Sequence, residues 1–478
     1  MQPLLTREAV RALDAAAIQK GVVGRVLMEN AGRGATDVLL EALGEHTRAI
    51  TIVGGPGQNG GDAWVVARHL RTRGIDCRAI LVADLAKVRG DARANLDALE
   101  ALGVDVEIVV PAQAGSVRLE GSSLIVDGLF GTGLDRPIAG GYATLIDEIA
   151  NTHAPVLALD VPSGVDASTG QRLGAAVQAD VTATFAALKA GLFQYPARGL
   201  AGEVHLVDIG VPPAVGADLW LIEDDDCRSW LGHRMADAHK GSAGHVVIIG
   251  GHKPGAAQLA ACAAMRAGAG WVSLVGAPAP RPEIMVVDDP NDALMNGKGA
   301  FVLGPGLGLD ARGRELAEQL ALELEAPGVL DADALSFWAE RGLEGLKSAA
   351  APRVLTPHPG EAARLLGITS AEVQRRRYEV AAELAERSGQ VVVLKGAGTI
   401  VASERLQRVS DAGTPALGVA GTGDVLAGVI AALLLSLPAA DAAAAGVHWH
   451  ARAGELAAEA DRGLFAGEVA DALPRFLG

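Results

Sequence analysis

Short apolar runs alternate with amphipathic segments along the first part of the chain. Thr6 is a candidate N-cap for an opening helix whose apolar residues recur at helical spacing, and a second helical pattern covers Ala63 to Arg73. Strands that alternate with helices imply right-handed crossovers, so this pattern predicts a Rossmann-like three-layer α/β domain with a mostly parallel sheet. Ligands are expected at the carboxyl ends of its strands. The predicted strands are residues 49–53, 76–82, 123–126 and 155–159.

The alternation is interrupted once and then resumes. Residues 211–218 contain two consecutive prolines and a glycine, which predicts a domain junction. We therefore expect two α/β domains, residues 1–216 and residues 217–478. The most apolar run, residues 425–437, is shorter than the roughly 20 residues that span a bilayer, so we expect a buried core helix there. The strands predicted after the junction are residues 245–249, 271–275, 300–303, 328–330 and 391–394.

Composition and charge exclude some classes of partner. The net charge of −16 argues against nucleic acid, because no run of basic residues offsets it locally. A small phosphorylated ligand remains compatible, since backbone amides can bind phosphate inside an acidic protein. Cys77, Cys227 and Cys262 are scattered and lack metal-ligand spacing, which suggests a reducing compartment. The N-terminus shows no export signal, so we expect a cytoplasmic protein without a membrane partner.

A glycine-rich loop, Gly55 to Asp62, follows a predicted strand and precedes a predicted helix. Free amides at a helix N-terminus favour an anion, so the loop is a candidate binding site. Its glycine spacing also matches the dinucleotide fingerprint, with Asp76 where a ribose-binding acid would fall, which would indicate a nicotinamide dehydrogenase. A purely structural glycine turn is the other alternative.

Two aspartates follow successive predicted strands of the first domain. Asp127 ends the strand at 123–126, and Asp160 ends the strand at 155–159. Carboxylates in these positions converge on one crevice, where they suit proton transfer or, with nearby amide and hydroxyl oxygens, a hard cation. Turn capping is the alternative for either residue alone.

A second glycine loop, Gly421-Thr422-Gly423-Asp424, precedes the apolar run of the second domain. Amides at this helix start could stabilise a transferring phosphoryl group while Asp424 takes a proton from a hydroxyl. A simple helix N-cap is the alternative. Exposed amides, hydroxyls and charges suited to phosphate also occur in four other segments, residues 304–308, 330–335, 356–361 and 395–399.

Three further polar clusters are expected to be structural. His448 and His450 are two residues apart, so they share no helix face and form no metal pair. Residues 224–226, three aspartates, are predicted to be a solvated turn, and residues 375–377, three arginines, a solvated helix face.

The motifs of the first domain resemble those of the NAD(P)H-hydrate epimerase family: Leu27 to Gly32, the loop at 55–62, Asp127 to Leu134 and Asp160 to Asp166. The resemblance implies a potassium ion on Asn59, Asp127 and Ser163, and Asp160 as the proton-transfer residue. Gln58 and Ala63 stand where the family usually has Asn and Gly, which alters the shape of the pocket. The implied contacts with the hydrate are Gln58, Asn59, Gly60, Gly61, Asp62, Gly131, Thr132, Gly133, Leu134, Asp135, Arg136, Pro137 and Asp160.

The second domain resembles the ribokinase-like fold and, within it, the ADP- or ATP-dependent NAD(P)H-hydrate dehydratases. The motifs that carry this resemblance lie at residues 240–245, 254–256, 304–308, 356–361, 395–399 and 421–424. Thr414 and Ala420 depart from the family's usual Asn and Gly. The resemblance implies that Ala256, Gly306, His358 and the catalytic Asp424 touch the hydrate, and that Lys395, Gly396, Ala397, Gly398, Thr399 and Gly423 touch the adenine nucleotide.

Together the two resemblances predict a bifunctional repair enzyme. An isomerase domain would interconvert the R and S hydrates of NADH and NADPH (NADHX and NADPHX), and a lyase domain would dehydrate the S form with ADP or ATP and Mg²⁺. A homo-oligomer is compatible with the sequence. Two alternatives remain: a small-molecule kinase whose first domain is only a nucleotide-binding scaffold, and a nicotinamide dehydrogenase.

Overall fold

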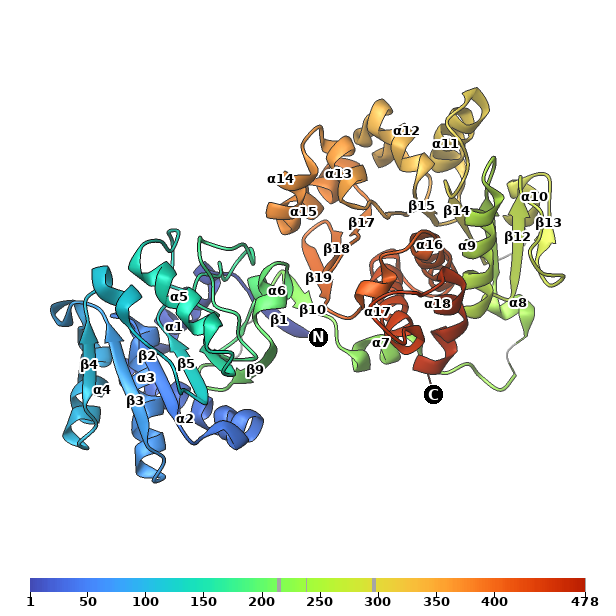
Figure 1. The fold of residues 1–478 in the computed structure, drawn as a ribbon. Coiled ribbons are helices and arrows are strands. Elements are labelled where there is room, and N and C mark those ends of the chain that lie inside the picture. The colour runs from blue at the N-terminus through green and yellow to red at the C-terminus, as the bar shows by residue number, and fades with distance from the viewer. Residues whose placement is uncertain (213–215, 238, 295–297, 478) are drawn as a thin grey trace. The chain divides into compact units, whose positions relative to one another are not determined.

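The computed structural model describes residues 1–212, 216–237, 239–294 and 298–477 (Figure 1). The chain divides into two compact units: a first unit, Pro3–Ala217, and a second unit made of Asp218–Gly478 together with Met1–Gln2. Pro212 of the predicted junction is described, whereas Pro213 lies outside the described residues.

The first unit is built on a seven-stranded sheet in the order β4-β3-β2-β5-β6-β7-β9, and each neighbouring pair is parallel. The four strands predicted for this unit are confirmed with ends shifted by at most two residues, and β4, β7 and β9 extend the sheet. A separate short pair, β1 with β8, is also parallel. The strands are β1 Gln2–Leu5, β2 Ile50–Gly54, β3 Cys77–Val82, β4 Val106–Val109, β5 Leu124–Gly128, β6 Val156–Leu159, β7 Val181–Phe185, β8 Leu188–Lys189 and β9 Glu203–Val207.

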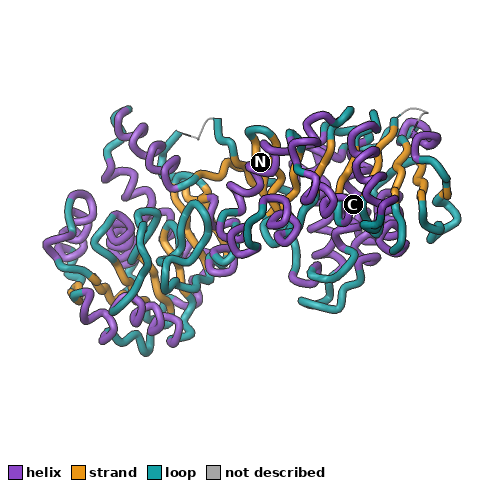
Figure 2. The backbone as a smooth tube through the Cα atoms, turned by 90° about the horizontal axis from the view of Figure 1, so that it is seen from above, coloured by secondary structure: helices purple, strands orange, loops and turns teal. Residues whose placement is uncertain are grey.

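Helices cover both faces of this sheet, as Figure 2 shows. Ile52 and Val53, neighbours on β2, belong to two different apolar cores, because alternate residues of a strand face opposite sides. The first core also contains Leu39 of α2 and Trp64 of α3, and the second contains Leu145 of α5. The three-layer prediction is confirmed. The helices are α1 Arg7–Gln19, α2 Gly24–Leu43, α3 Gln58–Thr72, α4 Gly90–Ala101, α5 Gly141–Asn151 and α6 Ala197–Leu200.

The second unit contains the strand order β13-β12-β11-β14-β15-β16-β17-β18-β19-β10. Pairing is parallel from β13 to β17, antiparallel for β17-β18-β19, and parallel again for β19 with β10. All five strands predicted here are confirmed, and the α/β class holds for both units. The strands are β10 Leu219–Leu221, β11 His245–Ile249, β12 Trp271–Val275, β13 Met285–Val286, β14 Gly299–Leu303, β15 Gly328–Leu330, β16 Arg353–Leu355, β17 Val391–Leu394, β18 Thr399–Ser403 and β19 Leu406–Ser410.

The predicted core helix is α16, Thr422–Leu434, and nearly all its residues are buried. It packs against α9, Pro254–Arg266, where Gly428 lies directly against the backbone of Ala260. Among the described residues, no helix is both long and apolar enough to cross a bilayer. The other helices are α7 Asp224–Leu231, α8 Lys240–Ala243, α10 Pro290–Leu294, α11 Ala311–Glu323, α12 Asp333–Arg341, α13 Pro359–Leu366, α14 Ser370–Arg375, α15 Arg377–Ser388, α17 Ala439–Ala457 and α18 Ala466–Ala472.

The prediction of a solvated turn at residues 224–226 is wrong. These aspartates form the first turn of α7, where carboxylates complement the positive end of the helix dipole. Asp224 also accepts hydrogen bonds from Arg452 Nε (2.7 Å) and lies 2.7 Å from Nε2 of the buried His448. The other ring nitrogen of His448 contacts Ser410 Oγ at 3.1 Å. His448 therefore has the structural role expected of it.

Gly428→Ala should destabilise the second unit. The added Cβ would lie 2.1 Å from the carbonyl oxygen of Ala260, so α16 and α9 must move apart at a cost of about 1–3 kcal/mol. The control is Gly467→Ala in α18, where the added Cβ meets no atom within 4 Å and alanine should stabilise the helix by up to about 1 kcal/mol. Thermal unfolding measures both effects. A Gly428→Ala variant that melts at the same temperature as the wild type would contradict the packing argument.

Candidate active sites

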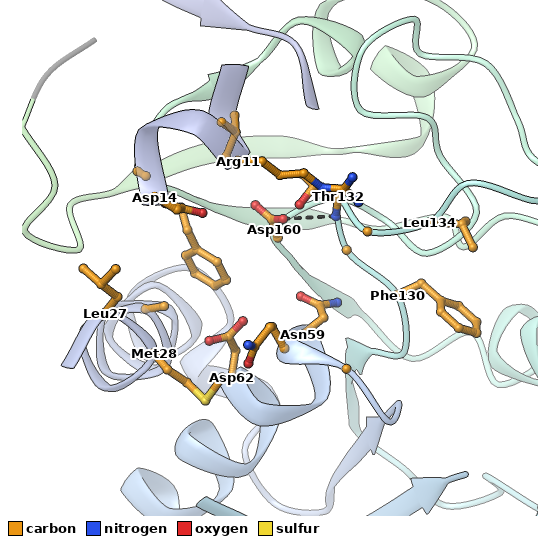
Figure 3. Close-up of a pocket in the computed structure, with 18 of the residues that line it drawn as sticks. Arg11, Asp14, Leu27, Met28, Asn59, Asp62, Phe130, Thr132, Leu134 and Asp160 are labelled. Atoms are coloured by element: carbon orange, nitrogen blue, oxygen red, sulfur yellow. Dashed lines mark hydrogen bonds between the residues drawn. The ribbon is translucent and has the colours of Figure 1, made fainter. Parts of the chain in front are cut away.

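A cavity of about 590 Å³ opens at the carboxyl ends of the strands of the first unit (Figure 3). Its walls come from α1, α2, the first turn of α3 and the loops that follow β5 and β6. Asp14, Asn59, Asp62 and Asp160 gather around it in Figure 3. The cavity lies where ligands are expected on a parallel α/β sheet.

The glycine loop before α3 folds tightly on itself. A Cβ at Gly60 would lie 1.9 Å from the carbonyl oxygen of Gly55, and one at Gly55 would lie 2.0 Å from that of Leu129. These glycines are therefore required for backbone packing, whatever ligand the loop binds. The loop places Asn59 in the first turn of α3, and both polar atoms of its buried side chain have no hydrogen-bond partner among the described residues.

Asp160 is paired with a buried lysine. Lys189 Nζ lies 2.5 Å from Asp160 Oδ1 and also donates to the carbonyl oxygen of Phe185 at 2.5 Å. The amide of Thr132 donates to Asp160 Oδ2 at 3.2 Å. Asp160 has a φ of 67°, a conformation that non-glycine residues adopt only at some cost, so the backbone is constrained to aim this carboxylate.

Two more carboxyl groups line the same cavity. Burial, with the carboxylate of Asp160 as the next cause, raises the pKa of Asp62 well above its usual range. Burial also raises the pKa of Asp14, and the charge of Lys189 only partly offsets this. Lys189 is paired with Asp160, whereas burial disfavours the charged forms of Asp14 and Asp62 on the same wall.

Asp127 and Ser163 lie together next to the cavity wall, where they accept hydrogen bonds from the amides of Leu129 and Phe130. The Ser163 hydroxyl and amide donate to the two carboxylate oxygens of Asp127 at 2.6 and 2.8 Å, and the Leu129 amide donates at 3.2 Å. Burial raises the pKa of Asp127, and the hydrogen bonds from Ser163 oppose the shift. Asp127 has no exposed surface.

The structure places most of the predicted epimerase contacts on the cavity wall. Gly60 and Gly61 instead pack against neighbouring backbone and side chains, and Pro137 does not line the cavity. Asp76 is also absent from the lining: its exposed carboxylate pairs with Arg71 at 2.6 Å, which removes the ribose-binding acid of the dehydrogenase alternative. The predicted contacts that line the cavity are Gln58, Asn59, Asp62, Gly131, Thr132, Gly133, Leu134, Asp135, Arg136 and Asp160.

In the second unit, Asp424 lies in the first turn of α16 and directly follows Gly423. Burial, followed by the charge of Asp331 and opposed by Lys395, raises the pKa of Asp424 to about 6. A Cβ on Gly423 would lie 3.3 Å from Lys395 Nζ, so the predicted nucleotide loop and the start of α16 are neighbours.

Lys395 is surrounded by carboxylates. Its Nζ lies 2.8 Å from Asp331 Oδ1 and 4.0 Å from Glu361 Oε2. Burial alone would lower the pKa of Lys395, but the charges of Asp331, Glu361 and Asp424 outweigh it and raise the pKa. Burial raises the pKa of Glu361 to about 7, although Lys395 opposes the shift.

His358 caps α13, and its neighbours link it to the same cluster. His358 Nδ1 accepts from the amide of Gly360 at 3.0 Å, while the His358 amide donates to Glu361 at 2.8 Å. Burial is the main cause that lowers the pKa of His358, and the positive charge of Lys395 lowers it further. The Lys395 amide donates to the carbonyl oxygen of Pro357 at 2.9 Å, which joins the two loops.

Gly306 and Ala256 also come close together. Gly306 accepts a hydrogen bond from the amide of Lys253 at 3.1 Å, and Ala256 lies in the first turn of the helix that follows Lys253. A Cβ on Gly306 would lie 2.2 Å from the carbonyl oxygen of Lys253, and its φ is 67°, so only glycine fits here. These contacts join two predicted hydrate-binding loops.

Comparisons with known proteins agree with both sets of motifs. The family described as "YjeF-related protein N-terminus" matches residues 24–191, and the family described as "NAD(P)H-hydrate dehydratase" matches residues 246–475. Proteins named bifunctional NAD(P)H-hydrate repair enzyme Nnr are 38% identical in Moorella thermoacetica (95% of this chain, 92% of the relative), 37% in Coxiella burnetii (98% and 98%) and 36% in Escherichia coli (94% and 89%). The chain belongs to this family of bifunctional NAD(P)H-hydrate repair enzymes.

Two solved structures are similar to about half of the chain. The ADP/ATP-dependent NAD(P)H-hydrate dehydratase from Bacillus subtilis, co-crystallized with ATP/Mg²⁺, is 29% identical and covers 55% of this chain and 98% of its own, with a TM-score of 0.45. A ribokinase-like superfamily protein from Enterococcus faecalis is 24% identical and covers 56% and 98%, with a TM-score of 0.49.

Sequence reasoning missed three residues of these sites. Lys189 follows the apolar run 185–188, which favours a core strand, and Asp14 lies in a helix without a motif. The prediction of a solvated arginine face is wrong for Arg377, because its side chain is buried against the predicted nucleotide loop. A lone charge beside an apolar run is the signal that could have singled out Lys189.

Lys189→Met should destabilise the first unit at neutral pH, because it leaves the Asp160 carboxylate buried without its partner. We expect a loss of about 3–5 kcal/mol at pH 7 in the free energy of unfolding, measured with denaturant. The exposed Lys20→Met is the control and should change little. The double variant Lys189→Met, Asp160→Asn should recover most of the loss; a double variant as unstable as the single one would contradict the pairing.

Proposed function

We propose that residues 1–216 epimerise the R and S hydrates of NADH and NADPH, and that residues 217–478 dehydrate the S form with ADP or ATP. The observation that carries this proposal is that one chain has two separate constellations. Asp160 faces a cavity and is paired with Lys189, while Asp424 lies at a helix start beside Lys395. The family membership supports both activities.

Asp160 is proposed as the proton-transfer residue of the epimerase. Inversion at C6 of the hydrate requires the carbon's bond to nitrogen or oxygen to open and close again, with a proton removed and returned. Asp160 faces the cavity and is oriented by Lys189 and by the Thr132 amide, so its carboxylate is positioned to accept and return that proton. Burial raises the pKa of Asp62 well above its usual range, which disfavours a second carboxylate charge beside Asp160.

Asn59 on the cavity wall and the neighbouring Asp127 and Ser163 fit a potassium ion. Asn59 Oδ1 is buried and unpartnered among the described residues, and the buried carboxylate of Asp127 is stabilised by neutral donors from Ser163 and Leu129. Oxygen donors with one negative charge are what a hard cation prefers. A cation held by Asn59, Asp127 and Ser163 would supply positive charge next to the glycine loop.

Asp424 is proposed as the proton acceptor of the dehydratase. It would take the proton from the C6 hydroxyl while that oxygen attacks the terminal phosphorus of the nucleotide. The phosphorylated oxygen then leaves with the C6–O electron pair, and loss of a proton from C5 forms the ring double bond. Lys395 and the amides at the start of α16 stabilise the transferring phosphoryl group.

Magnesium is proposed to arrive with the nucleotide. In the described part of the chain, no three His, Cys, Asp or Glu side chains form a metal-binding group. Asp331 and Glu361 flank Lys395 and could contact a nucleotide-bound ion, because Mg²⁺ commonly combines one or two carboxylates with substrate phosphates.

A mixture of R and S hydrates tests the two assignments together. With ADP or ATP the intact chain should recover all of the dihydronicotinamide, read by its absorbance, and without nucleotide it should recover none. Asp160→Asn should stop at the S fraction, whereas Asp424→Asn should still epimerise the pool but fail to dehydrate it, because an amide cannot accept the proton. Nucleotide-independent recovery would overturn the dehydratase assignment, and full recovery by Asp160→Asn faster than spontaneous epimerisation would overturn the epimerase assignment.

Epimerisation should depend on potassium through Asn59. Replacing potassium by a large inert cation should slow the wild type, while Asn59→Ala should be slow in both because it lacks the oxygen ligand. Epimerisation rates in the two salts measure the effect, and dehydration of pure S hydrate serves as the internal control. Equal wild-type rates in the two salts would exclude a functional ion.

A further inference from the structure

Only the last of the three consecutive arginines is buried. Arg375 and Arg376 are exposed, whereas Arg377, the first residue of helix α15, is only 4% exposed. Burying a guanidinium is costly unless its N–H groups find acceptors. The acceptors of the Arg377 guanidinium therefore need to be identified.

The guanidinium of Arg377 binds the carbonyl oxygens of the segment proposed to bind nucleotide. Its Nη2 donates to Leu394 (3.2 Å), Lys395 (3.4 Å) and Gly398 (3.2 Å). Its Nη1 donates to Lys395 at 3.4 Å and to the side chain of Gln374 at 3.2 Å. One side chain thus holds three carbonyl groups of a five-residue segment, residues 394–398.

This arrangement sets the direction of the loop's amides. In a planar trans peptide the N–H points away from the preceding carbonyl oxygen, so the Gly396 amide points away from Arg377. Among the described residues that amide donates no hydrogen bond, while the carbonyl of Gly396 accepts from Thr399 Oγ1 at 2.7 Å. The loop therefore offers a free donor on the side opposite the guanidinium.

The turn of the loop requires glycine at position 396. Gly396 has a φ of 130°, and a Cβ there would lie 3.2 Å from Arg377 Nη1. Lys395, which begins the loop, reaches Gly423 at the start of α16 with its ammonium group. A phosphate placed between these two elements would meet Lys395, the Gly396 amide and a helix N-terminus.

We propose that Arg377 is a positioning residue that preorganises the nucleotide loop by holding its carbonyl groups away from the bound phosphates. The proposal rests on the assignment of residues 395–399 to nucleotide binding. Without Arg377, the carbonyl dipoles of Lys395 and Gly398 are free to turn toward the anion and repel it. Lysine cannot replace it, because a single ammonium lacks the planar fork that reaches three carbonyl oxygens.

A second buried arginine provides a matched control. Arg353 is fully buried and likewise donates to backbone carbonyl groups, here four: those of Ala321 (2.8 Å), Leu324 (2.6 Å), Ala326 (2.8 Å) and Pro352 (3.3 Å). These carbonyls belong to the end of α11, the segment after it and the residue before β16, and none of them is part of the proposed loop. Arg353→Lys should therefore lower stability without changing nucleotide binding.

The test measures ADP binding by titration calorimetry together with KM for ADP and kcat on pure S hydrate. Arg377→Lys should weaken ADP binding and raise its KM about tenfold, the equivalent of one lost charged hydrogen bond. Gln374→Ala removes only the exposed partner of Arg377 and should give a smaller rise, about two- to threefold, with an intact fold. Arg353→Lys should leave KM for ADP unchanged, although its melting temperature falls.

Three results would count against the proposal in distinguishable ways. If the wild type binds and uses ADP, and both Arg377→Lys and Gln374→Ala bind ADP as tightly as the wild type, Arg377 has only a structural role and the proposed function survives. If Arg353→Lys weakens ADP binding as much as Arg377→Lys, the effect reflects general instability. If the wild type binds no adenine nucleotide, the assignment of the loop fails and the positioning role fails with it.

Discussion

Each unit depends on a lysine, buried in the first unit and partly buried in the second, that is paired with an aspartate directly following a parallel strand. Lys189 pairs with Asp160 after β6, and Lys395 pairs with Asp331 after β15. Both pairs lie beside a helix that starts from a glycine loop. An unpaired charge at either position would be very costly, so each pair holds strand end, loop and helix start in one arrangement.

The pairs also affect the pKa values of the neighbouring carboxyl groups. Both sites contain more carboxyl groups than cations, and the single lysine cannot compensate all of them. The pKa of Asp62 in the first unit and those of Glu361 and Asp424 in the second are raised for this reason together with burial. Groups whose pKa values are separated in this way suit proton transfer near neutral pH.

Much of the fold was predictable because the parallel strands are buried on both faces and read as apolar runs. His245–Ile249 and Trp271–Val275 occupy the predicted residues. The hairpin β18-β19 was missed, because its short strands contain Thr, Ser, Gln and Arg. The glycine loops and their aspartates were predictable from local spacing, whereas Lys189 and Arg377 were not, because their partners are distant in sequence or are backbone carbonyls.

The helix that carries Asp424 is also the central core element of the second unit. Its residues from Val425 onward are almost all buried, and it packs closely on α9 through Gly428. Such a helix opens only when the whole unit unfolds, so the position of Asp424 is protected from local fraying. The same arrangement restricts how far substitutions can move Asp424, since a shift of α16 would disturb the packing of the entire unit.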